Sequence, residues 1–313
     1  MKVVVTGGAG FIGANLCRAL AAAPAVREVV AFDDLSTGSE ANLAGAGLET
    51  VKLIEGTIVD ATALDHVFEG AGAVVHLAAR PSVPRSLIDP IASHVANATG
   101  TLEVLEAARR AGGPLVIAAS SSSVYGASPV IPKREDLAPR PVSPYAASKL
   151  AAESYVLAYQ HSFGLPTLAF RFFNVFGPLQ PAGHAYAAVV PAFVDAALDG
   201  RPLPIHGDGQ QSRDFTFVDT VTAVITDAVV RGVSSPTPVN LAFGTRTTLL
   251  HLVDELEAVL DQPVTVEHLD PRKGDVRHSQ ADDSALRALF PDIKAVTLSE
   301  GLARTVEWMR SAR

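Results

Sequence analysis

Cysteine, long apolar runs and clustered basic residues are scarce or absent in this chain of 313 residues. The single cysteine, Cys17, allows no internal disulfide, so we expect a reducing compartment, the cytoplasm. No apolar run approaches the roughly 18 residues that suggest a transmembrane helix, so no membrane contact is expected. The formal net charge is −8 and no basic stretch stands out, which argues against a nucleic-acid partner. The nine histidines are scattered and have no cysteine partners, so no metal site is predicted.

Short runs rich in β-branched residues alternate with Ala- and Leu-rich runs in the first half of the chain. The apolar runs are continuous, as is typical of strands that are buried on both faces of a parallel sheet. Strands and helices in turn predict an α/β fold, a Rossmann-like doubly wound parallel sheet. The predicted strands span residues 2–7, 28–33, 50–56, 72–78, 114–120 and 166–173. Helices are predicted over residues 11–22, in a long stretch that ends near 106–113, and from 143 onward.

A glycine-rich turn, VTGGAGFIG, links the first predicted strand to the first predicted helix. Gly7, Gly10 and Gly13 allow a tight turn and a close approach of the backbone to a pyrophosphate at the helix N-terminus. A glycine turn without a ligand is the alternative, and the position between strand and helix favours binding. Asp33 ends the second strand, where a carboxylate accepts hydrogen bonds from ribose hydroxyls and repels a 2′-phosphate. No basic residue follows in DDLSTG, which favours NAD over NADP, although Asp33 could also cap a loop.

The second half of the chain is less regular. Residues 175–215 are rich in Gly, Pro and polar residues around one predicted helix at about 186–199, and the run 238–243 is predicted to return to the sheet. We therefore expect an NAD-binding Rossmann domain over residues 1–174, with returning segments near 214–245. Residues 175–213 and 246–313 are predicted to form a smaller, interleaved α/β lobe that binds the substrate.

A serine run and a Tyr/Lys pair are the candidates for chemistry. Four serines, residues 120–123, follow the fifth predicted strand, at the sheet edge where ligands bind in open α/β sheets. Tyr145 and Lys149 stand four apart at the start of a predicted helix, so they share one face. Separately, such features are usually a polar turn and a surface pair. Together they predict that Tyr145 is the general acid/base, that Lys149 holds the cofactor ribose and lowers the Tyr145 pKa, and that a serine shares a hydrogen bond with the reacting oxygen.

With these motifs the chain resembles the extended short-chain dehydrogenases/reductases, and within them the nucleotide-sugar epimerases and dehydratases. The matching runs extend over almost the whole chain: TGGAGFIG, DDLSTG, HLAA, SSSSVYG, SPYAASK, RFFNVFGP, GDGQQSRDFTFVD and RKGDVRHSQAD. The resemblance implies NAD as a tightly held cofactor that is regenerated in each turnover. It also implies a UDP-sugar substrate, and a homodimer formed through helices near residues 90–110 and 145–162.

The resemblance further implies a site of three parts. The catalytic residues are Ser121, Tyr145 and Lys149. The cofactor is expected to contact Gly7, Gly10, Phe11, Ile12, Gly13, Asp33, Asp34, Ser36, Thr37, Gly38, Ile58, Asp60, Leu77, Ala78, Ala79, Asn97, Tyr145, Lys149 and Phe172. The substrate is expected to contact Ser121, Ser122, Ser123, Tyr145, Asn174, Arg213, Arg272, Asp275 and Ser279. Asp60 has a helix cap as its alternative role, and each arginine has a surface salt bridge.

The residues before VYG bear on the reaction. Family dehydratases and decarboxylases carry an acid there, whereas this chain has Ser122 and Ser123. A serine has no useful proton affinity near neutral pH, so elimination is disfavoured. The resemblance therefore implies a UDP-sugar 4-epimerase that oxidises C4 to a 4-keto intermediate, lets the sugar rotate, and reduces C4 from the other face. A dehydratase or decarboxylase of the same family, and a non-catalytic NAD-binding protein, remain alternatives.

Two positions bear on the identity of the sugar. Enzymes of this family that are strict for UDP-galactose carry a Tyr where this chain has Ser279 and an Ala where it has Ser122. The smaller residue at 279 is expected to leave room for an N-acetyl group. The Ser122 hydroxyl is expected to hydrogen-bond an acetamido group or a C6 carboxylate. UDP-glucose and UDP-galactose are thus the expected substrates, with N-acetylhexosamine and uronate forms as further candidates.

Overall fold

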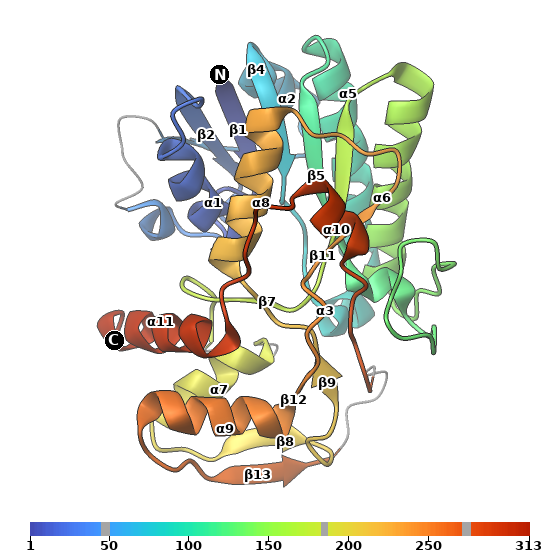
Figure 1. Cartoon of the computed structure of the whole chain (residues 1–313). Helices are drawn as coiled ribbons and strands as arrows, with labels where there is room; N and C mark the ends of the chain where they lie inside the picture. The colour runs from blue at the N-terminus through green and yellow to red at the C-terminus, as the bar shows by residue number, and fades with distance from the viewer. Residues whose placement is uncertain (45–50, 183–186, 271–276) are drawn as a thin grey trace.

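A seven-stranded sheet forms the centre of the computed structural model, which describes residues 1–44, 51–182, 187–270 and 277–313 (Figure 1). The strand order is β11-β6-β5-β4-β1-β2-β3, and all neighbouring strands are parallel. The strands are β1 (Lys2–Thr6), β2 (Glu28–Asp33), β3 (Val51–Glu55), β4 (Ala71–His76), β5 (Leu115–Ser121), β6 (Thr167–Phe172) and β11 (Val239–Leu241). The predicted doubly wound Rossmann-like fold is confirmed. The order reverses between β1 and β4, the switch point at which such sheets bind ligands.

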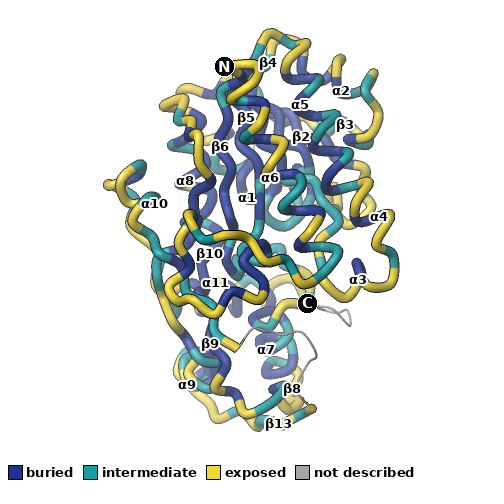
Figure 2. The backbone as a smooth tube through the Cα atoms, turned by 90° about the vertical axis from the view of Figure 1, so that its right-hand side faces the viewer, coloured by how far each residue is buried: buried dark blue, intermediate teal, exposed yellow. Residues whose placement is uncertain are grey.

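The strands are buried on both faces because alternate side chains enter two different cores. In β1, Val3 and Val5 point into one core and Val4 into the other, and all three are fully buried. Figure 2 shows the same pattern as dark blue strands enclosed by helices whose outer faces are exposed. This double burial explains why the strands appear in the sequence as continuous apolar runs.

Helices cover both faces of the sheet. On one face α1 (Phe11–Ala21) packs beside α8 (Val218–Arg231), and on the other α2 (Ala61–Phe68), α5 (Gly100–Arg110) and α6 (Pro144–Phe163) lie together. Helix α6 begins where the Ser143 hydroxyl accepts a hydrogen bond from the Ala146 N–H at 3.1 Å, and it ends at Gly164 in the left-handed conformation. These caps place Tyr145 and Lys149 in its first two turns, as the sequence predicts.

The long helix that is predicted to end near residues 106–113 is divided into several pieces. Helix α3 (Val83–Ile88) ends at Asp89, and α4 (Pro90–His94) begins immediately after it. The Asp89 carboxylate caps α4 by accepting a hydrogen bond from the Ala92 N–H at 3.0 Å. Pro90 has no N–H and cannot continue a helix, so the chain restarts there. A π-helical turn, η2 (Val95–Thr99), then leads into α5.

A second group of elements lies below the sheet in Figure 1 and has a core of its own. It contains the parallel pair β8 (Leu203–His206) and β13 (Val266–Leu269), with α7 (Val189–Leu198), α9 (Leu249–Leu260) and α11 (Leu298–Ser311). The remaining elements are β7 (Val175–Phe176) paired with β10 (Thr216–Phe217), β9 (Ser212–Arg213) paired with β12 (Thr247–Thr248), α10 (Ser284–Leu289), and the 3-10 turns η1 (Glu40–Leu43) and η3 (Ser122–Tyr125).

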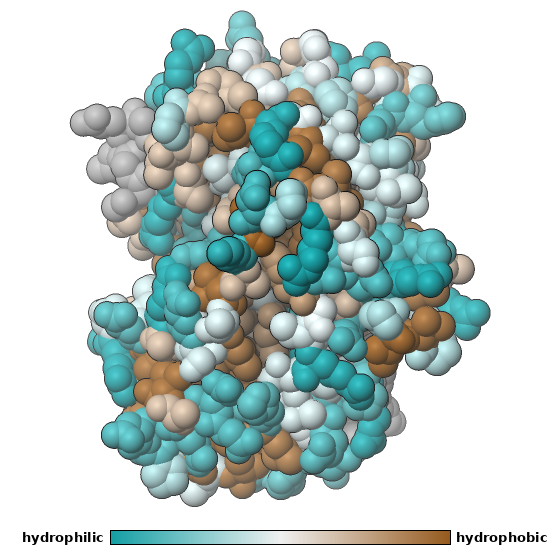
Figure 3. Space-filling model, in the orientation of Figure 1, coloured by the Kyte–Doolittle hydropathy of each residue, from teal (hydrophilic) through white to brown (hydrophobic). Residues whose placement is uncertain are grey.

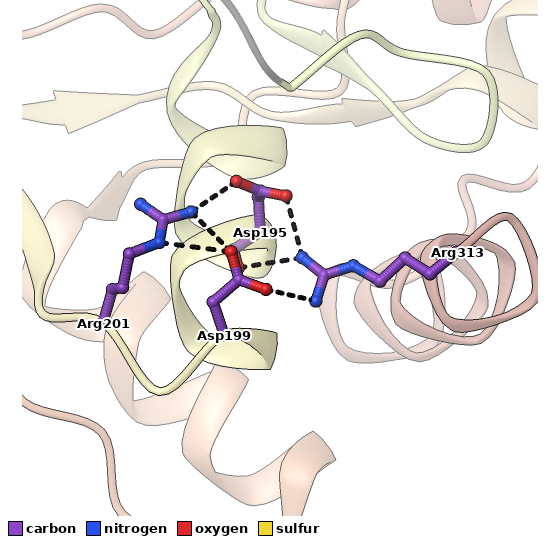
Figure 4. A network of polar contacts seen from close by, with 4 residues as sticks. All are labelled: Asp195, Asp199, Arg201 and Arg313. Atoms are coloured by element: carbon purple, nitrogen blue, oxygen red, sulfur yellow. Dashed lines mark hydrogen bonds and ion pairs between the residues drawn. The ribbon is translucent and has the colours of Figure 1, made fainter.

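Ion pairs connect the last residue of the chain to α7 (Figure 4). Asp195 and Asp199 stand one turn apart on α7 and lie between two arginines. Arg313 donates to Asp199 at 2.6 Å and to Asp195 at 2.8 Å, and Arg201 donates to the same two carboxylates from the other side. These side chains are partly or largely exposed to solvent, so the pairs contribute little to stability, and they connect the end of the chain after α11 to α7.

Polar residues cover much of the face shown in Figure 3, which is hollowed between the sheet and the lower elements. Within the described residues, no helix combines the length and the apolar character that crossing a membrane requires.

His76 is a titratable residue inside the core. It ends β4, and its ring nitrogens lie 2.7 Å from the Thr6 hydroxyl and 3.0 Å from the Thr101 hydroxyl. Burial, together with a smaller effect of the nearby Lys149 ammonium, lowers the pKa of His76 from 6.5 to about 3. The folded chain therefore holds a neutral imidazole, whereas the unfolded chain binds a proton below pH 6.5.

We predict that this difference makes the fold acid-sensitive. Between pH 6.5 and about 3 the unfolded state binds more protons, so the free energy of unfolding falls as the pH falls. From pH 7 to pH 5 the His76 contribution is a loss of ~2 kcal/mol. Urea unfolding at both pH values should show a smaller loss for His76→Gln than for the wild type. His251→Gln, at an exposed histidine, is the control and should keep the wild-type loss. Equal losses in all three proteins would contradict the assignment.

Candidate active site

In the turn between β1 and α1, neighbouring backbone segments approach each other closely. Gly7 has φ +72°, and a Cβ there would lie 2.7 Å from the Ala78 nitrogen, so the chain leaving β4 passes directly over the turn. A Cβ at Gly13 would lie 2.0 Å from the Gly7 carbonyl oxygen. Gly10 is the N-cap of α1 and offers no side-chain cap. The first N–H groups of α1, at Phe11, Ile12 and Gly13, are therefore oriented as a helix N-terminus that suits an anion.

Asp33 holds the loop that faces this turn. Its carboxylate accepts hydrogen bonds from the Ala9 N–H and from the Leu35 N–H, both at 2.9 Å. Burial raises the pKa of Asp33, and these backbone hydrogen bonds oppose the rise. The loop-capping role that the sequence left open is thus present. A ribose contact, which stays a prediction, would use the remaining acceptor capacity of the same carboxylate.

The rest of DDLSTG packs on the glycine turn. The Asp34 carboxylate accepts hydrogen bonds from both the hydroxyl and the N–H of Ser36. A Cβ at Gly38 would lie 2.8 Å from the Ala9 carbonyl carbon, so only glycine fits this position. Thr37 lies between Ser36 and Gly38 in the same loop. These predicted cofactor residues are therefore brought to one place, beside the switch point.

Other predicted cofactor residues have visible structural partners. Asp60 caps α2 by accepting from the N–H groups of Thr62 and Ala63, which is its alternative role. The buried Asn97 amide accepts from the Arg80 N–H at 2.7 Å and donates to the Ser148 hydroxyl at 2.9 Å. For both residues the cofactor contact remains a prediction.

The apolar cofactor candidates lie at strand ends or against helices. Ile58 packs closely on α5, because a Cβ at Gly100 would lie only 2.4 Å from its Cδ1 and clash with it. Leu77, Ala78 and Ala79 follow β4 directly, and Leu77 continues the β1–β4 hydrogen bonding. Phe172 is paired in register with Ser121 across β6 and β5. This pairing places Phe172 at the sheet edge that carries the serine run.

Ser121 and Tyr145 come together at the carboxyl end of β5, where the start of α6 packs on this strand and the Ser121 side chain is near enough to act on the Tyr145 phenol. The Ser121 hydroxyl also accepts a hydrogen bond from the Ser123 N–H at 3.1 Å, which caps the turn η3. The predicted convergence of a serine with the phenol is therefore observed.

Lys149 lies one turn after Tyr145 and is buried, with 5% of its surface exposed. Burial lowers the pKa of Lys149 to about 8, and the Glu153 carboxylate acts in the opposite direction. Burial raises the pKa of Tyr145, and the nearby Ser121 hydroxyl opposes this rise. In the protein alone, the net shift at Tyr145 is thus opposite to the lowering that the sequence predicts. Desolvation of the phenolate outweighs its neighbours.

The two serines before VYG differ in their surroundings. Ser122 begins η3 and is partly exposed. The Ser123 hydroxyl is buried, and within the described residues it has no hydrogen-bond partner. A buried hydroxyl without a partner costs free energy, so Ser123 is a place where a ligand group would complete a hydrogen bond.

On the substrate side, the structure brings Asn174, Arg213 and Ser279 onto neighbouring strands and loops. Asn174 follows β6 with φ +27° and donates from its amide to the Asp214 carbonyl at 3.1 Å. Arg213 lies in β9 and donates to the Ser212 carbonyl at 2.9 Å. The Ser279 N–H donates to that same carbonyl at 3.0 Å, so Arg213 and Ser279 are close in space. The predicted Arg272 and Asp275 lie outside the described residues.

Sequence reasoning missed a buried ion pair directly behind the site. Glu153 on α6 and Arg171 on β6 have side chains only 3% exposed, and they meet at 2.7 Å. Two signals were present in the sequence. Glu153 follows Tyr145 and Lys149 at the same four-residue spacing, and Arg171 interrupts an apolar strand.

One cavity lies elsewhere, between β10, β12 and the start of α11. It has a volume of about 360 Å³ and is lined by residues such as Phe215, Thr216, Thr245, Arg287 and Leu298. None of the predicted site residues in the described ranges lines it. We give more weight to the residues at the strand ends, because Ser121, Tyr145 and the glycine turn lie there and none of them lines this cavity.

The described geometry supports proton transfer beside a bound dinucleotide. A helix N-terminus, close-approach glycines and a strand-end carboxylate suit a pyrophosphate and a ribose. A phenol beside a serine hydroxyl, with a buried ammonium one turn away, suits proton exchange with a hydroxyl or carbonyl group.

Comparisons with known proteins agree with this reading. The model of the NAD dependent epimerase/dehydratase family matches residues 3–242. A "UDP-glucose 4-epimerase" of Mycolicibacterium smegmatis is 38% identical, with 99% of each chain covered. The structure of a UDP-N-acetylglucosamine 4-epimerase from Methanobrevibacter ruminantium, in complex with UDP-N-acetylmuramic acid, superposes with a TM-score of 0.93 at 36% identity, covering 100% and 99% of the two chains. A UDP-glucuronic acid 4-epimerase from Bacillus cereus, solved with UDP-glucuronic acid and NAD, has a TM-score of 0.90 at 29% identity, with both chains fully covered.

Proposed function

This chain belongs to the NAD dependent epimerase/dehydratase family, and on that premise we propose that it is an isomerase, a UDP-sugar 4-epimerase that uses NAD. The observation that carries the proposal is the convergence of Ser121, at the carboxyl end of β5, with Tyr145 at the start of α6, with the buried Lys149 one turn further along that helix. These are the groups that proton exchange at a secondary alcohol requires. The relatives named above act on UDP-sugars at C4 and support this substrate class.

The residues of the chain divide the chemistry between them. Tyr145 accepts the proton of the 4-hydroxyl group and later returns it to the new 4-hydroxyl. Ser121, which lies beside the same phenol, donates a hydrogen bond to the sugar oxygen and holds it in line with Tyr145. The Lys149 ammonium is needed in its charged form to stabilise the phenolate. With a pKa of about 8, Lys149 is mostly charged at neutral pH.

The glycine turn, the N-terminus of α1 and Asp33 fit NAD. Gly7 and Gly13 let the turn pack tightly against the chain after β4 and against itself, and the uncapped start of α1 provides N–H donors for the pyrophosphate. Asp33 favours a ribose with a free 2′-hydroxyl. When bound, NAD supplies the acceptor and the donor of the hydride at C4. Domain boundaries at 1–174 with 214–245, against 175–213 with 246–313, are part of this proposal: the first part holds the dinucleotide and the second the UDP-sugar.

The serines at 122 and 123 favour epimerisation over the two enzymatic alternatives. Dehydration or decarboxylation needs a group near the sugar that can remove or deliver a second proton. Serine hydroxyls do not ionise near neutral pH, so they hydrogen-bond the substrate instead. A non-catalytic NAD-binding protein would not need a serine beside Tyr145 or a buried lysine one turn further along the helix.

A homodimer completes the proposal. Leu87, Ile88 and Ile91 on α3 and α4 are 66%, 72% and 75% exposed, and Tyr155 on the adjoining α6 is 40% exposed. Apolar side chains gathered on neighbouring helices are typical of a surface that another protein covers. A second copy of the chain, paired through these helices, would bury them. The single cysteine fits a cytoplasmic setting for this enzyme.

The cofactor assignment predicts what the purified protein carries. Protein purified without additives should release NAD(H) on denaturation, and no NADP. Asp33→Ala should bind NAD about 10-fold to 100-fold more weakly, since hydrogen bonds to a charged group are lost. Asp33→Asn removes the charge and keeps one acceptor for the loop, so it should lose mainly the discrimination against NADP. Calorimetric titration with both dinucleotides measures this. NADP in the wild-type protein would refute the assignment.

The acid/base assignment predicts the effect of removing one oxygen. Tyr145→Phe keeps the ring and deletes the ionisable group. Epimerisation should fall by ~10² to 10⁴-fold, the range for a positioned proton-transfer group, while UDP-sugar still binds. Tyr155→Phe, on the same helix but exposed, is the matched control and should keep wild-type turnover. Normal turnover by Tyr145→Phe would mean that another group carries the proton.

The specificity assignment is tested at Ser279. We predict that the wild type accepts at least one UDP-sugar bulkier than UDP-glucose, the N-acetyl form or the uronate. Ser279→Tyr should suppress that activity more than UDP-glucose turnover, because a clash discriminates more strongly than the loss of a small apolar contact. The ratio of the two kcat/KM values is the measurement, with the exposed Ser299→Tyr as control. An unchanged ratio would show that residue 279 is no gate.

A further inference from the structure

Glu153 continues the row of functional side chains along α6. Tyr145, Lys149 and Glu153 stand at successive four-residue intervals, so all three lie on one face of the helix. Glu153 is 4% exposed. A carboxylate at this depth is costly unless other groups compensate its charge.

Three elements hold the Glu153 carboxylate in place. The Ser120 hydroxyl, on β5, donates to it at 2.6 Å. Arg171, on β6, donates to its two oxygens from Nε at 2.9 Å and from Nη2 at 2.7 Å, the bidentate arrangement of an arginine fork. The guanidinium lies over the Tyr125 ring at 4.7 Å and also donates to the Glu135 carbonyl at 3.3 Å. The carboxylate is therefore fixed in position, with little freedom to rotate.

The Glu153–Arg171 ion pair is neutral as a unit, and a second buried cation, Lys149, stands one turn before Glu153 on α6. Lys149 and Arg171 are both buried cations, and Glu153 is the carboxylate that acts on Lys149. On its other side, a cavity of about 10 Å³ separates Glu153 from His76, which burial keeps neutral. Replacing a buried ion pair by apolar residues often leaves stability unchanged, so a contribution to the fold does not by itself account for the pair.

We propose that Glu153 is a positioning residue for Lys149: a fixed, buried counter-charge one turn further along α6, which keeps the Lys149 ammonium charged beside Tyr145. The inference rests on the proposed function of Lys149. It assigns no substrate or cofactor contact to Glu153, which acts through its neighbour.

The experiment is a direct titration of Lys149. The chain has six lysines, so protein labelled with ¹³C at lysine Cε gives few signals in NMR, and the Lys149 signal is identified by its loss in Lys149→Met. In Glu153→Gln, which keeps the shape and removes the charge, the Lys149 pKa should fall by about one pH unit, as expected when an opposite charge is removed. The alkaline limb of kcat should move to lower pH by the same amount, with KM little changed.

Glu153→Gln leaves the buried Arg171 unpaired. If that variant does not fold, a second variant tests the same inference. Glu153→Gln combined with Arg171→Gln removes both charges and retains hydrogen-bonding groups, and it should shift the Lys149 pKa in the same direction by a smaller step. Asp227→Asn, which breaks an exposed ion pair with Arg231 on α8, is the control and should leave the titration unchanged.

The outcomes separate the possible roles. If Glu153 only ties α6 to β6, the variants lose stability while Lys149 titrates as in the wild type, and the inference is overturned. The titration needs no substrate. A wild-type protein without epimerase activity would therefore refute the proposed function and leave the NMR result to stand or fall separately.

Discussion

The bidentate ion pair between Glu153 and Arg171 fixes α6 against the carboxyl half of the sheet, and the geometry of the candidate site depends on this contact. Ser120 joins the pair from β5, and Ser121 is the next residue along that strand. Because Tyr145 lies two turns before Glu153 on the same helix, holding the helix at Glu153 also sets where the phenol meets Ser121. An exposed ion pair would not supply this rigidity, since water would compete for both partners.

Burial shifts the pKa values in this arrangement in opposite directions, because it disfavours the charged form of every group. At His76 and Lys149 it disfavours the charged form, and at Tyr145 it disfavours the phenolate. A site that exchanges protons near neutral pH therefore needs fixed charges that offset desolvation. Glu153 provides one such charge for Lys149, and Lys149 in turn is the cation next to Tyr145 along the helix. The proton exchange proposed at the sheet edge thus depends on Glu153, a residue to which no contact with cofactor or sugar is assigned.

The sequence alone predicted the strands of the sheet and the placement of Tyr145 and Lys149 on one helix, because each of these features leaves a local signal. Strands buried on both faces appear as unbroken apolar runs, and Ser143 with Pro144 marks the start of α6. The restart at Pro90 was missed because helical composition continues on both sides of it. The contacts of Asn97 and Glu153 were not predictable, because Arg80, Ser148, Ser120 and Arg171 reach them from distant parts of the chain. Such partners are known only once the strand order is known.

The central claim, reversible oxidation at C4 within one closed site, is tested most directly with isotope. UDP-glucose, UDP-N-acetylglucosamine and UDP-glucuronate, each carrying deuterium at C4, would be incubated with the protein without added NAD, and the products analysed by NMR and mass spectrometry. The account predicts that at least one is converted to its C4 epimer and that deuterium stays at C4, because hydride leaves and returns without meeting solvent. A deoxygenated or decarboxylated product, deuterium lost to water, or no C4 epimer from any of the three would contradict it.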